Sequence, residues 1–191
     1  VLGHRLEGQR QRGDEEGQTF TKNLGKPILP SFLSVADDPT IKRFEGTYLS
    51  GTYEFDDEGQ PAQKVNLIDD GVLKTFLMSR LPIASFSESN GHGRSQVGRM
   101  PTGRQGNLIV TSTKMVPDAN LRQMLIDEAR KQGKAYGLMF EDISSGFAVT
   151  TRNSPQAFQV LPLVVYRVYV DGRPDELVRG VSIVGTPQAA L

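Results

Sequence analysis

The chain of 191 residues contains only two histidines, His4 and His92, and no cysteine. Imidazole is a common zinc ligand, so either histidine could bind a metal, whereas thiolate ligands and thiol nucleophiles are excluded within this chain. The sequence also lacks a GxSxG elbow, a P-loop and a dinucleotide-binding fingerprint. Each histidine has a structural alternative, because a lone histidine is more often structural or exposed than a ligand. Nothing near His92 in the sequence supports a role as a ligand.

A glycine-rich polar loop is predicted from Ser87 to Asn107, with the sequence SESNGHGRSQVGRMPTGRQGN. Its glycines could present backbone N–H groups to an anion, and Arg94 would add positive charge. Arg94, Arg104 and Asn107 could bind the backbone or a carboxylate of a substrate. The alternative for the two arginines is that they are solvated or paired with acidic turns.

Several acidic residues resemble metal-binding pairs, namely Asp56, Asp57, Asp69 and Asp70. Each lies where a hairpin turn favours acidic residues followed by glycine, so we interpret all four as turn residues. For Glu7 we expect a capping or surface carboxylate near a helix end.

These residues must be positioned by a scaffold, and the sequence predicts that this scaffold consists mostly of β-strands. We expect a helix end from Val1 to about Arg12, ended by Gly13, and one internal helix from Asp118 to about Gln132, ended by Gly133. The strands expected from their apolar and β-branched runs are residues 46–55, 62–68, 72–78, 108–112 and 176–184, together with AYGLMFED, GFAVTTR and VLPLVVYRVYVDG. The sequence therefore predicts an α+β fold, mainly antiparallel β-sheet with hairpins, one long internal helix and an N-terminal helix end, in a single domain over residues 1–191.

The composition limits the possible partners. Twenty-two basic and 22 acidic residues give a formal net charge of zero, so there is no overall attraction to nucleic acid or to anionic lipid. No run approaches the roughly 20 apolar residues that span a bilayer. We expect neither nucleic acid nor membrane as a partner, and the absence of cysteine favours a reducing, cytoplasmic location.

Taken together, the motifs resemble the C-terminal, metallopeptidase part of the TldD/PmbA family. The most specific match is the run from Asp56 to Leu73, which contains DDEG, AQ, LI, an acidic turn and GVL, followed by a glycine-rich loop with GxGR. The segments GHRLEG, from Gly3 to Gly8, and VDGRPDELVRGVSIVGTPQAAL, at the end of the chain, are also similar to the family. The resemblance covers most of the chain.

The resemblance implies a zinc-dependent peptidase that acts on peptides or unfolded proteins. The family motif is H-E-x-x-x-H followed by LEG, and His4 aligns with its last histidine. The first histidine and the glutamate would then precede Val1, and the third ligand, a cysteine, would follow Leu191. His4 would therefore be one of three metal ligands, and the chain alone would be inactive. The resemblance also implies that Arg94, Arg104 and Asn107 bind substrate and that the protein forms a dimer with a sibling subunit.

The spacing of the two histidines in that motif does not fit a regular helix if both bind one metal ion. Histidines five residues apart diverge by roughly 140° around a regular helix, unlike the i, i+4 pair of HExxH enzymes. A π-bulge would bring them together, and Gly3 beside His4 would permit one at low cost. In the whole protein the motif glutamate would act as general base on a metal-bound water.

Two stretches depart from the family pattern. Residues 155–167 are more apolar than expected and indicate either an extra strand or a patch for a partner subunit. Residues 13–41 are long and match poorly. Two other hypotheses stay open beside the peptidase: a metal-free family member that acts as a scaffold in a heterodimer, and a β-rich binding module without hydrolytic activity.

Overall fold

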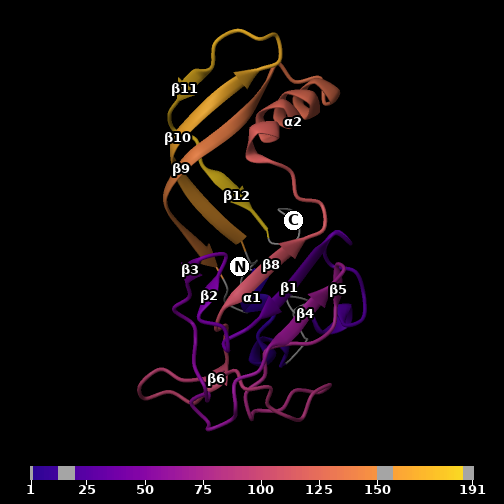
Figure 1. The fold of residues 1–191 in the computed structure, drawn as a ribbon, viewed down its shortest axis with the longest axis vertical. Coiled ribbons are helices and arrows are strands. Elements are labelled where there is room, and N and C mark those ends of the chain that lie inside the picture. Colours follow the sequence, from indigo (N-terminus) through magenta and orange to yellow (C-terminus); the bar gives the residue numbers. More distant parts are fainter. Residues whose placement is uncertain (1, 13–19, 150–156, 187–191) are drawn as a thin grey trace. The chain divides into compact units, whose positions relative to one another are not determined.

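The computed structural model describes residues 2–12, 20–149 and 157–186. These residues form two compact units, shown in Figure 1: one holds the described residues up to Thr113, and the other holds residues 114–149 and 157–186. Each unit is described by itself, and the single domain over residues 1–191 stays a prediction. No helix in the described parts of the chain is both long enough and apolar enough to cross a lipid bilayer.

The first unit is built on a four-stranded antiparallel sheet in the order β5-β4-β1-β8. Its strands are β1 (Leu33–Asp37), β4 (Val65–Asp69), β5 (Val72–Leu73) and β8 (Leu108–Ser112). One face of the sheet packs on a hydrophobic core, which includes Val35, Leu67, Leu73, Phe76 and Leu77. Small two-stranded pairs flank the sheet: β2 (Arg43–Phe44) with β3 (Thr47–Tyr48), and β6 (Gly93–Arg94) with β7 (Thr102–Gly103).

The acidic turn between β4 and β5 forms as its sequence predicts. Asp70 has φ 47° and Gly71 has φ 80°, and positive φ at both central residues is typical of a type I′ hairpin turn. The predicted strand over residues 72–78 is too long, because regular pairing ends at Leu73. Leu77 instead pairs with the backbone around Glu7: its N–H donates to Leu6, and its carbonyl accepts from Gly8, each over 2.8 Å.

Two other predicted elements are corrected. The N-terminal helix α1 spans only Leu2–Arg5 and is followed by a 3₁₀ turn, η1 (Gly8–Gln11), because the backbone at Glu7 pairs with Leu77 instead of continuing a helix. The expected stop at Gly13 lies outside the described residues. The stretch 46–55 forms a strand only at Thr47–Tyr48, since Asn107 takes up the backbone N–H of Gly51. A further 3₁₀ turn, η2, spans Thr21–Asn23.

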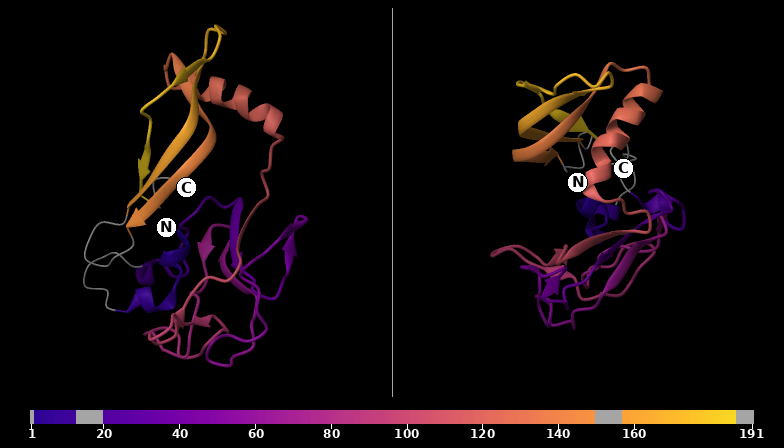
Figure 2. Two further views of the ribbon diagram at one scale, coloured as in Figure 1. Left: turned by 90° about the vertical axis from the view of Figure 1, so that its left-hand side faces the viewer. Right: turned by 45° about the horizontal axis from the view of Figure 1, so that its top comes forward.

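The second unit consists of a long hairpin and one helix. Strands β9 (Tyr136–Val149) and β10 (Ala157–Tyr169) run side by side along their length (Figure 2), and β10 also pairs with β11 (Glu176–Val178) and β12 (Ile183–Gly185). All of these pairings are antiparallel. The described part of the apolar segment 155–167 therefore lies on a central strand. The predicted strand 176–184 is divided between β11 and β12.

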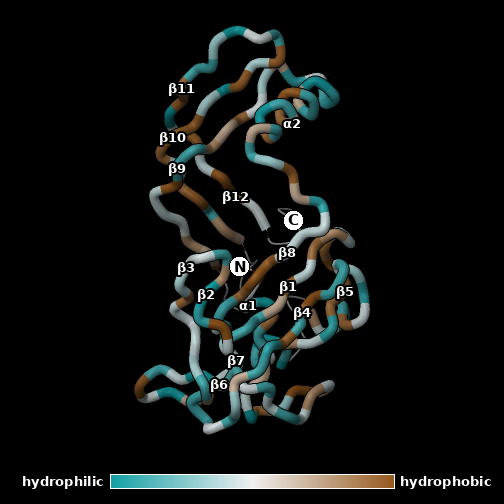
Figure 3. Tube along the Cα trace, in the orientation of Figure 1, coloured by the Kyte–Doolittle hydropathy of each residue, from teal (hydrophilic) through white to brown (hydrophobic). Residues whose placement is uncertain are grey.

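The predicted internal helix is confirmed as α2 (Asp118–Lys131), which ends where Gly133 takes a positive φ of 66°. The helix is largely hydrophilic (Figure 3) and contacts β9 and β10. Leu125 packs against the backbone of Gly137, where a methyl group would lie 2.5 Å from the Leu125 Cδ1 atom. Arg122 makes a two-pronged ion pair with Asp175, over 2.6 and 2.7 Å, that joins α2 to the segment before β11. The observed fold is therefore α+β with mainly antiparallel sheets, as expected.

Candidate active site

His4 lies on α1 and is paired with a buried carboxylate three residues later, just beyond the end of the helix. Its Nδ1 atom lies 2.7 Å from Oε1 of Glu7, whose side chain is fully buried. An ionised carboxylate can only accept hydrogen bonds, so Nδ1 of His4 donates and a neutral ring keeps its lone pair on Nε2. The His4 side chain is 38% exposed, so the ring can be reached from solvent.

Glu7 is the centre of a polar cluster. Both of its carboxylate oxygens lie within 3.3 Å of Nη1 of Arg104, and Oε2 also accepts a hydrogen bond from Gln9 over 3.0 Å. Burial raises the pKa of Glu7, but the hydrogen bond from His4 and the nearby charges of His4, Arg104 and Arg10 outweigh it, so the pKa lies below its ordinary value. Glu7 is therefore ionised at neutral pH. The expectation of a capping or surface carboxylate is wrong, because Glu7 is buried and its carboxylate contacts five neighbouring side chains, those of His4, Gln9, Arg10, Arg104 and Gln105.

The pairing of His4 with Glu7 is the arrangement that zinc-binding histidines commonly show, in which a carboxylate fixes the ring and its tautomer. The donor set is nevertheless incomplete in the described part of the chain. Residues 2–12, 20–149 and 157–186 contain no group of three His, Cys, Asp or Glu side chains that could hold a metal ion. These residues therefore offer one oriented imidazole, not a metal site by themselves.

Arg94 and Arg104 are brought together at a pocket of about 450 Å3, which we call the arginine pocket. It lies on the loop between β6 and β7, and its lining residues are Arg94, Ser95, Gln96, Arg99, Met100, Thr102 and Arg104. Through its ion pair with Glu7, Arg104 connects the arginine pocket to His4. Two of the three predicted substrate-binding residues thus share one cavity near the candidate metal ligand.

Asn107 lies apart from that pocket and is buried. Its Nδ2 group donates to the carbonyls of Asp38 and Ile41 and to Oγ1 of Thr52, over 3.1–3.2 Å, while its Oδ1 accepts from the N–H of Gly51. The amide is thus engaged in holding two loops together. Its predicted contact with substrate stays a prediction.

His92 is fully buried and is held by hydrogen bonds on both ring nitrogens. Nδ1 lies 2.9 Å from the carbonyl of Asn90, and Nε2 lies 3.1 Å from Oδ1 of the buried Asp37. The same Asp37 oxygen accepts the backbone N–H groups of Gly106 and Asn107. His92 therefore anchors the glycine-rich loop to β1, in line with the structural alternative.

The acidic pair at the start of the first hairpin does more than form a turn. Oδ1 of Asp56 accepts the N–H groups of Glu58 and Gln60 within the turn, and its Oδ2 accepts the N–H of Gly93 over 2.8 Å. Asp57 accepts the N–H of Ser95 over 2.6 Å and lies 3.3 Å from Nε of Arg94. The turn assignment holds for Asp56 and Asp57, since the N–H of Gly59 donates to the Asp56 carbonyl and closes the turn, but both carboxylates also fix the base of the loop that carries the arginine pocket.

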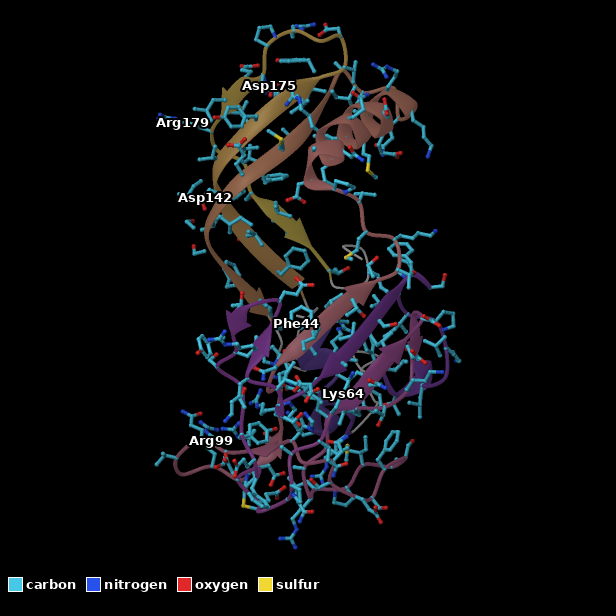
Figure 4. All side chains as sticks on the ribbon, in the orientation of Figure 1. Phe44, Lys64, Arg99, Asp142, Asp175 and Arg179 are labelled. Carbon is cyan, nitrogen blue, oxygen red and sulfur yellow. The ribbon has the colours of Figure 1, made fainter. Side chains whose placement is uncertain are left out.

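A second cavity, of about 350 Å3, lies against strands β4, β1 and β8. Phe44, Lys64 and Ile109 are among the residues that line it, and Figure 4 labels the first two. None of the predicted site residues lines this cavity.

A comparison with protein families adds to this geometry. Residues 1–191 match the family model described as the PmbA/TldA metallopeptidase C-terminal domain. The chain belongs to the TldD/PmbA family. The resemblance drawn from the Asp56–Leu73 run and the loop motif is thereby confirmed.

Curated TldD/PmbA relatives carry metalloprotease names. A metalloprotease of Methanothermobacter thermautotrophicus is 29% identical over 189 residues, which cover 97% of this chain and 36% of that protein. The metalloprotease TldD homolog of Buchnera aphidicola subsp. Acyrthosiphon pisum is 33% identical over 116 residues, which cover 60% of this chain and 23% of that protein. The chain thus spans about a third or less of these relatives.

The fold also matches solved structures of the family. TldE from Thermococcus kodakarensis superposes with a TM-score of 0.64 at 16% identity and covers 99% of this chain and 38% of that one. At this identity the likeness concerns the fold alone.

The feature that sequence reasoning missed is the role of Glu7. One local signal was available, because residues three apart on a helix are neighbours and could have linked Glu7 to His4. The other partners could not be found in this way, since Arg104 lies 97 residues further along the chain.

Proposed function

We propose that this chain is part of a zinc-dependent metallopeptidase that hydrolyses peptides or unfolded proteins, with His4 as one metal ligand. The observation that carries the proposal is the hydrogen bond from Nδ1 of His4 to the buried, ionised Glu7. This bond fixes the tautomer in which Nε2 can bind a metal, and it orients the ring. The metalloprotease names of the family relatives support the same activity.

We propose that the other ligands of the site lie outside the described residues, because these contain no group of three side chains that could hold a metal ion. When bound, zinc would supply an activated water and polarise the peptide carbonyl. In this chain, Glu7 holds the ring of His4, and Arg104 balances the buried charge of Glu7. Arg94, Arg104 and Asn107 are proposed to contact the substrate. We propose that the chain alone is inactive and that the whole protein works in the cytoplasm.

We also propose that the whole protein works as a dimer, with a sibling TldD/PmbA-type subunit as the favoured partner. The described hairpin strands β9 and β10 expose large apolar side chains, among them Ile143, Phe147 and Leu163. Burial of such side chains in an interface is favourable, and several exposed apolar side chains on two paired strands are consistent with a subunit contact. The existence of family members named both TldD and TldE is consistent with two kinds of subunit.

The experiment that tests the peptidase is metal content and casein cleavage of the whole protein, measured beside His4→Ala. We expect near-stoichiometric zinc and casein cleavage in the wild type and loss of both in the variant. Arg179→Gln, at an exposed position of the second unit, is the control and should keep both. Equal zinc and equal cleavage in wild type and His4→Ala would exclude His4 as a ligand, and the scaffold or the binding module would then be the better hypothesis.

A further inference from the structure

The arginine pocket has a lining that suits an anion. Three of its seven lining residues are arginines, Arg94, Arg99 and Arg104, and none is acidic. The Met100 side chain is the apolar part of the lining. The other three residues, Ser95, Gln96 and Thr102, are neutral and polar. Such a cavity offers several guanidinium donors to one small negatively charged group.

The three arginines are not equally engaged. Arg94 lies 3.3 Å from Asp57, and Arg104 lies 3.2 Å from Glu7. Arg99 is exposed on the loop between β6 and β7 (Figure 4), and its guanidinium has no ion pair or hydrogen bond with any residue that the structure describes. Both carboxylates have lowered pKa values, Asp57 chiefly through the backbone N–H of Ser95, so both are ionised at neutral pH. The charges of Arg94 and Arg104 are thus balanced by carboxylates, whereas the charge of Arg99 is not balanced by any described residue.

The two ends of the loop are held in place before any ligand binds. The guanidinium of Arg94 stacks 4.4 Å from the ring centre of Tyr53, and the hydroxyl of Tyr53 donates to the carbonyl of Gly91. At the other end, Gly103 lies so close to the carbonyl of Leu77 that a methyl group there would be 2.1 Å from the oxygen. Donors that are fixed in advance lose less entropy on binding.

We propose that the arginine pocket binds a carboxylate of the peptide substrate, with Arg99 as the residue that selects for it. Guanidinium groups bind carboxylates through paired, charge-assisted hydrogen bonds, which matches the donors of this pocket. The contact of Arg104 with Glu7 places the subsite beside His4, so it would recognise a carboxylate near the bond to be cleaved. The carboxylate has two sources, an Asp or Glu side chain and the C-terminal carboxylate of the peptide. The substrate class rests on the proposed peptidase function.

Binding can be tested with four labelled peptides that share one sequence. They carry either Glu or Gln at one central position and end in either a free carboxylate or an amide. Fluorescence anisotropy measures their affinity for the whole protein as purified, on ice and at low salt, with mass spectrometry to verify that each peptide is intact. We expect at least one carboxylate peptide to bind about tenfold more tightly than the Gln amide, the effect of one charge-assisted contact. An advantage confined to the Glu peptides identifies a side-chain subsite, and one confined to free ends identifies a C-terminal subsite.

Arg99→Gln should remove this advantage, so that its four peptides bind within about twofold of each other, whereas Arg179→Gln should keep it. Arg99 is exposed, so the variant is expected to fold, which circular dichroism verifies. The proposal is overturned if the wild type binds all four peptides equally, if Arg99→Gln keeps the preference, or if a single-stranded oligonucleotide competes better than the peptides. Casein cleavage and zinc content of the wild type separate the two proposals. Cleavage without carboxylate preference refutes only the pocket, and preference without cleavage or zinc refutes only the peptidase.

Discussion

Glu7 shows how one buried carboxylate can organise a site. It sits between the ring of His4 and the guanidinium of Arg104, so the candidate metal ligand and the arginine pocket share one negative charge. Such a charge is expensive to bury unless it is paired, and here the pairing is supplied by the groups that would bind metal and substrate. A substitution of Glu7 is therefore expected to affect both metal binding by His4 and substrate binding by the arginine pocket.

Glu7→Gln is predicted to lower the zinc affinity of the whole protein by roughly tenfold or more, because mutation of a carboxylate behind a metal-binding histidine typically has an effect of this size. The amide keeps an acceptor for His4 but loses the charge that Arg104 and Arg10 balance. Competition with a chromogenic chelator measures the affinity. Glu88→Gln, at an exposed position of the same unit, should bind zinc like the wild type. Unchanged zinc affinity in a folded Glu7→Gln protein would contradict the assigned role of Glu7.

Tyr53 gives a prediction for alkaline pH. Burial, followed by the negative charge of Asp37, raises the pKa of Tyr53 to about 12. The unfolded chain loses this proton near pH 10 while the folded chain keeps it, so the resulting stability is present below about pH 10 and is lost as the pH rises towards 12. At neutral pH, Tyr53→Phe should be less stable by about 1 kcal/mol, since the Gly91 carbonyl loses its donor.

Urea unfolding of wild type and Tyr53→Phe from pH 7 to 11 tests this sign. The stability difference should stay constant up to about pH 9 and then shrink, because only the wild type has a phenol to titrate at this position. A difference that stays constant or grows above pH 10 would mean that the folded state does not raise this pKa.

Elements defined by local chemistry were predictable from the sequence, and those defined by distant partners were not. The turn at Asp70–Gly71 and the helix α2 follow from residues within a few positions of each other, and both are found as expected. The strand predicted to continue to Met78 ends early because the segment around Leu77 pairs with the segment after α1. Similarly, the interactions of Asn107 with Asp38 and Thr52 have no local sequence signal. At the site, the positions of Arg94 and Arg104 could be named, but not their shared cavity.

The packing of α2 on β9 depends on a missing side chain at Gly137. Gly137→Ala would place its methyl group 2.5 Å from Cδ1 of Leu125, so we expect a loss of about 1–3 kcal/mol from overpacking. In the double variant with Leu125→Ala the clash is removed, so the loss should be smaller than the sum of the two single losses. Chemical denaturation of all four proteins, followed by circular dichroism, completes this cycle. Strictly additive losses would show that the two residues are not coupled.

At the scale of the whole molecule, the proposed dimer can be tested on the exposed apolar side chains of the hairpin strands β9 and β10. Leu163→Glu, at a β10 residue that is 61% exposed, should dissociate the dimer, because a carboxylate would have to be buried in the interface. Sedimentation velocity of the whole protein measures the mass, and mass spectrometry identifies the subunits. Val97→Glu, at a fully exposed apolar position of the first unit, is the matched control and should remain dimeric. An unchanged dimer mass in Leu163→Glu would place the interface elsewhere.

The strand order β5-β4-β1-β8 also bears on the synthesis of the protein. Strand β1 lies between β4 and β8, and its Leu33 pairs with Ser112, which leaves the ribosome much later than the β4–β5 hairpin. Residues are added at roughly 5–20 per second, so the edge of β1 that pairs with β8 stays unpaired for several seconds after β1 has been synthesised. During that time the nascent chain presents an unpaired strand edge to other chains. Slowing translation before residue 108 would lengthen this exposure, so the order of the sheet makes the yield of folded protein sensitive to the pace of the ribosome.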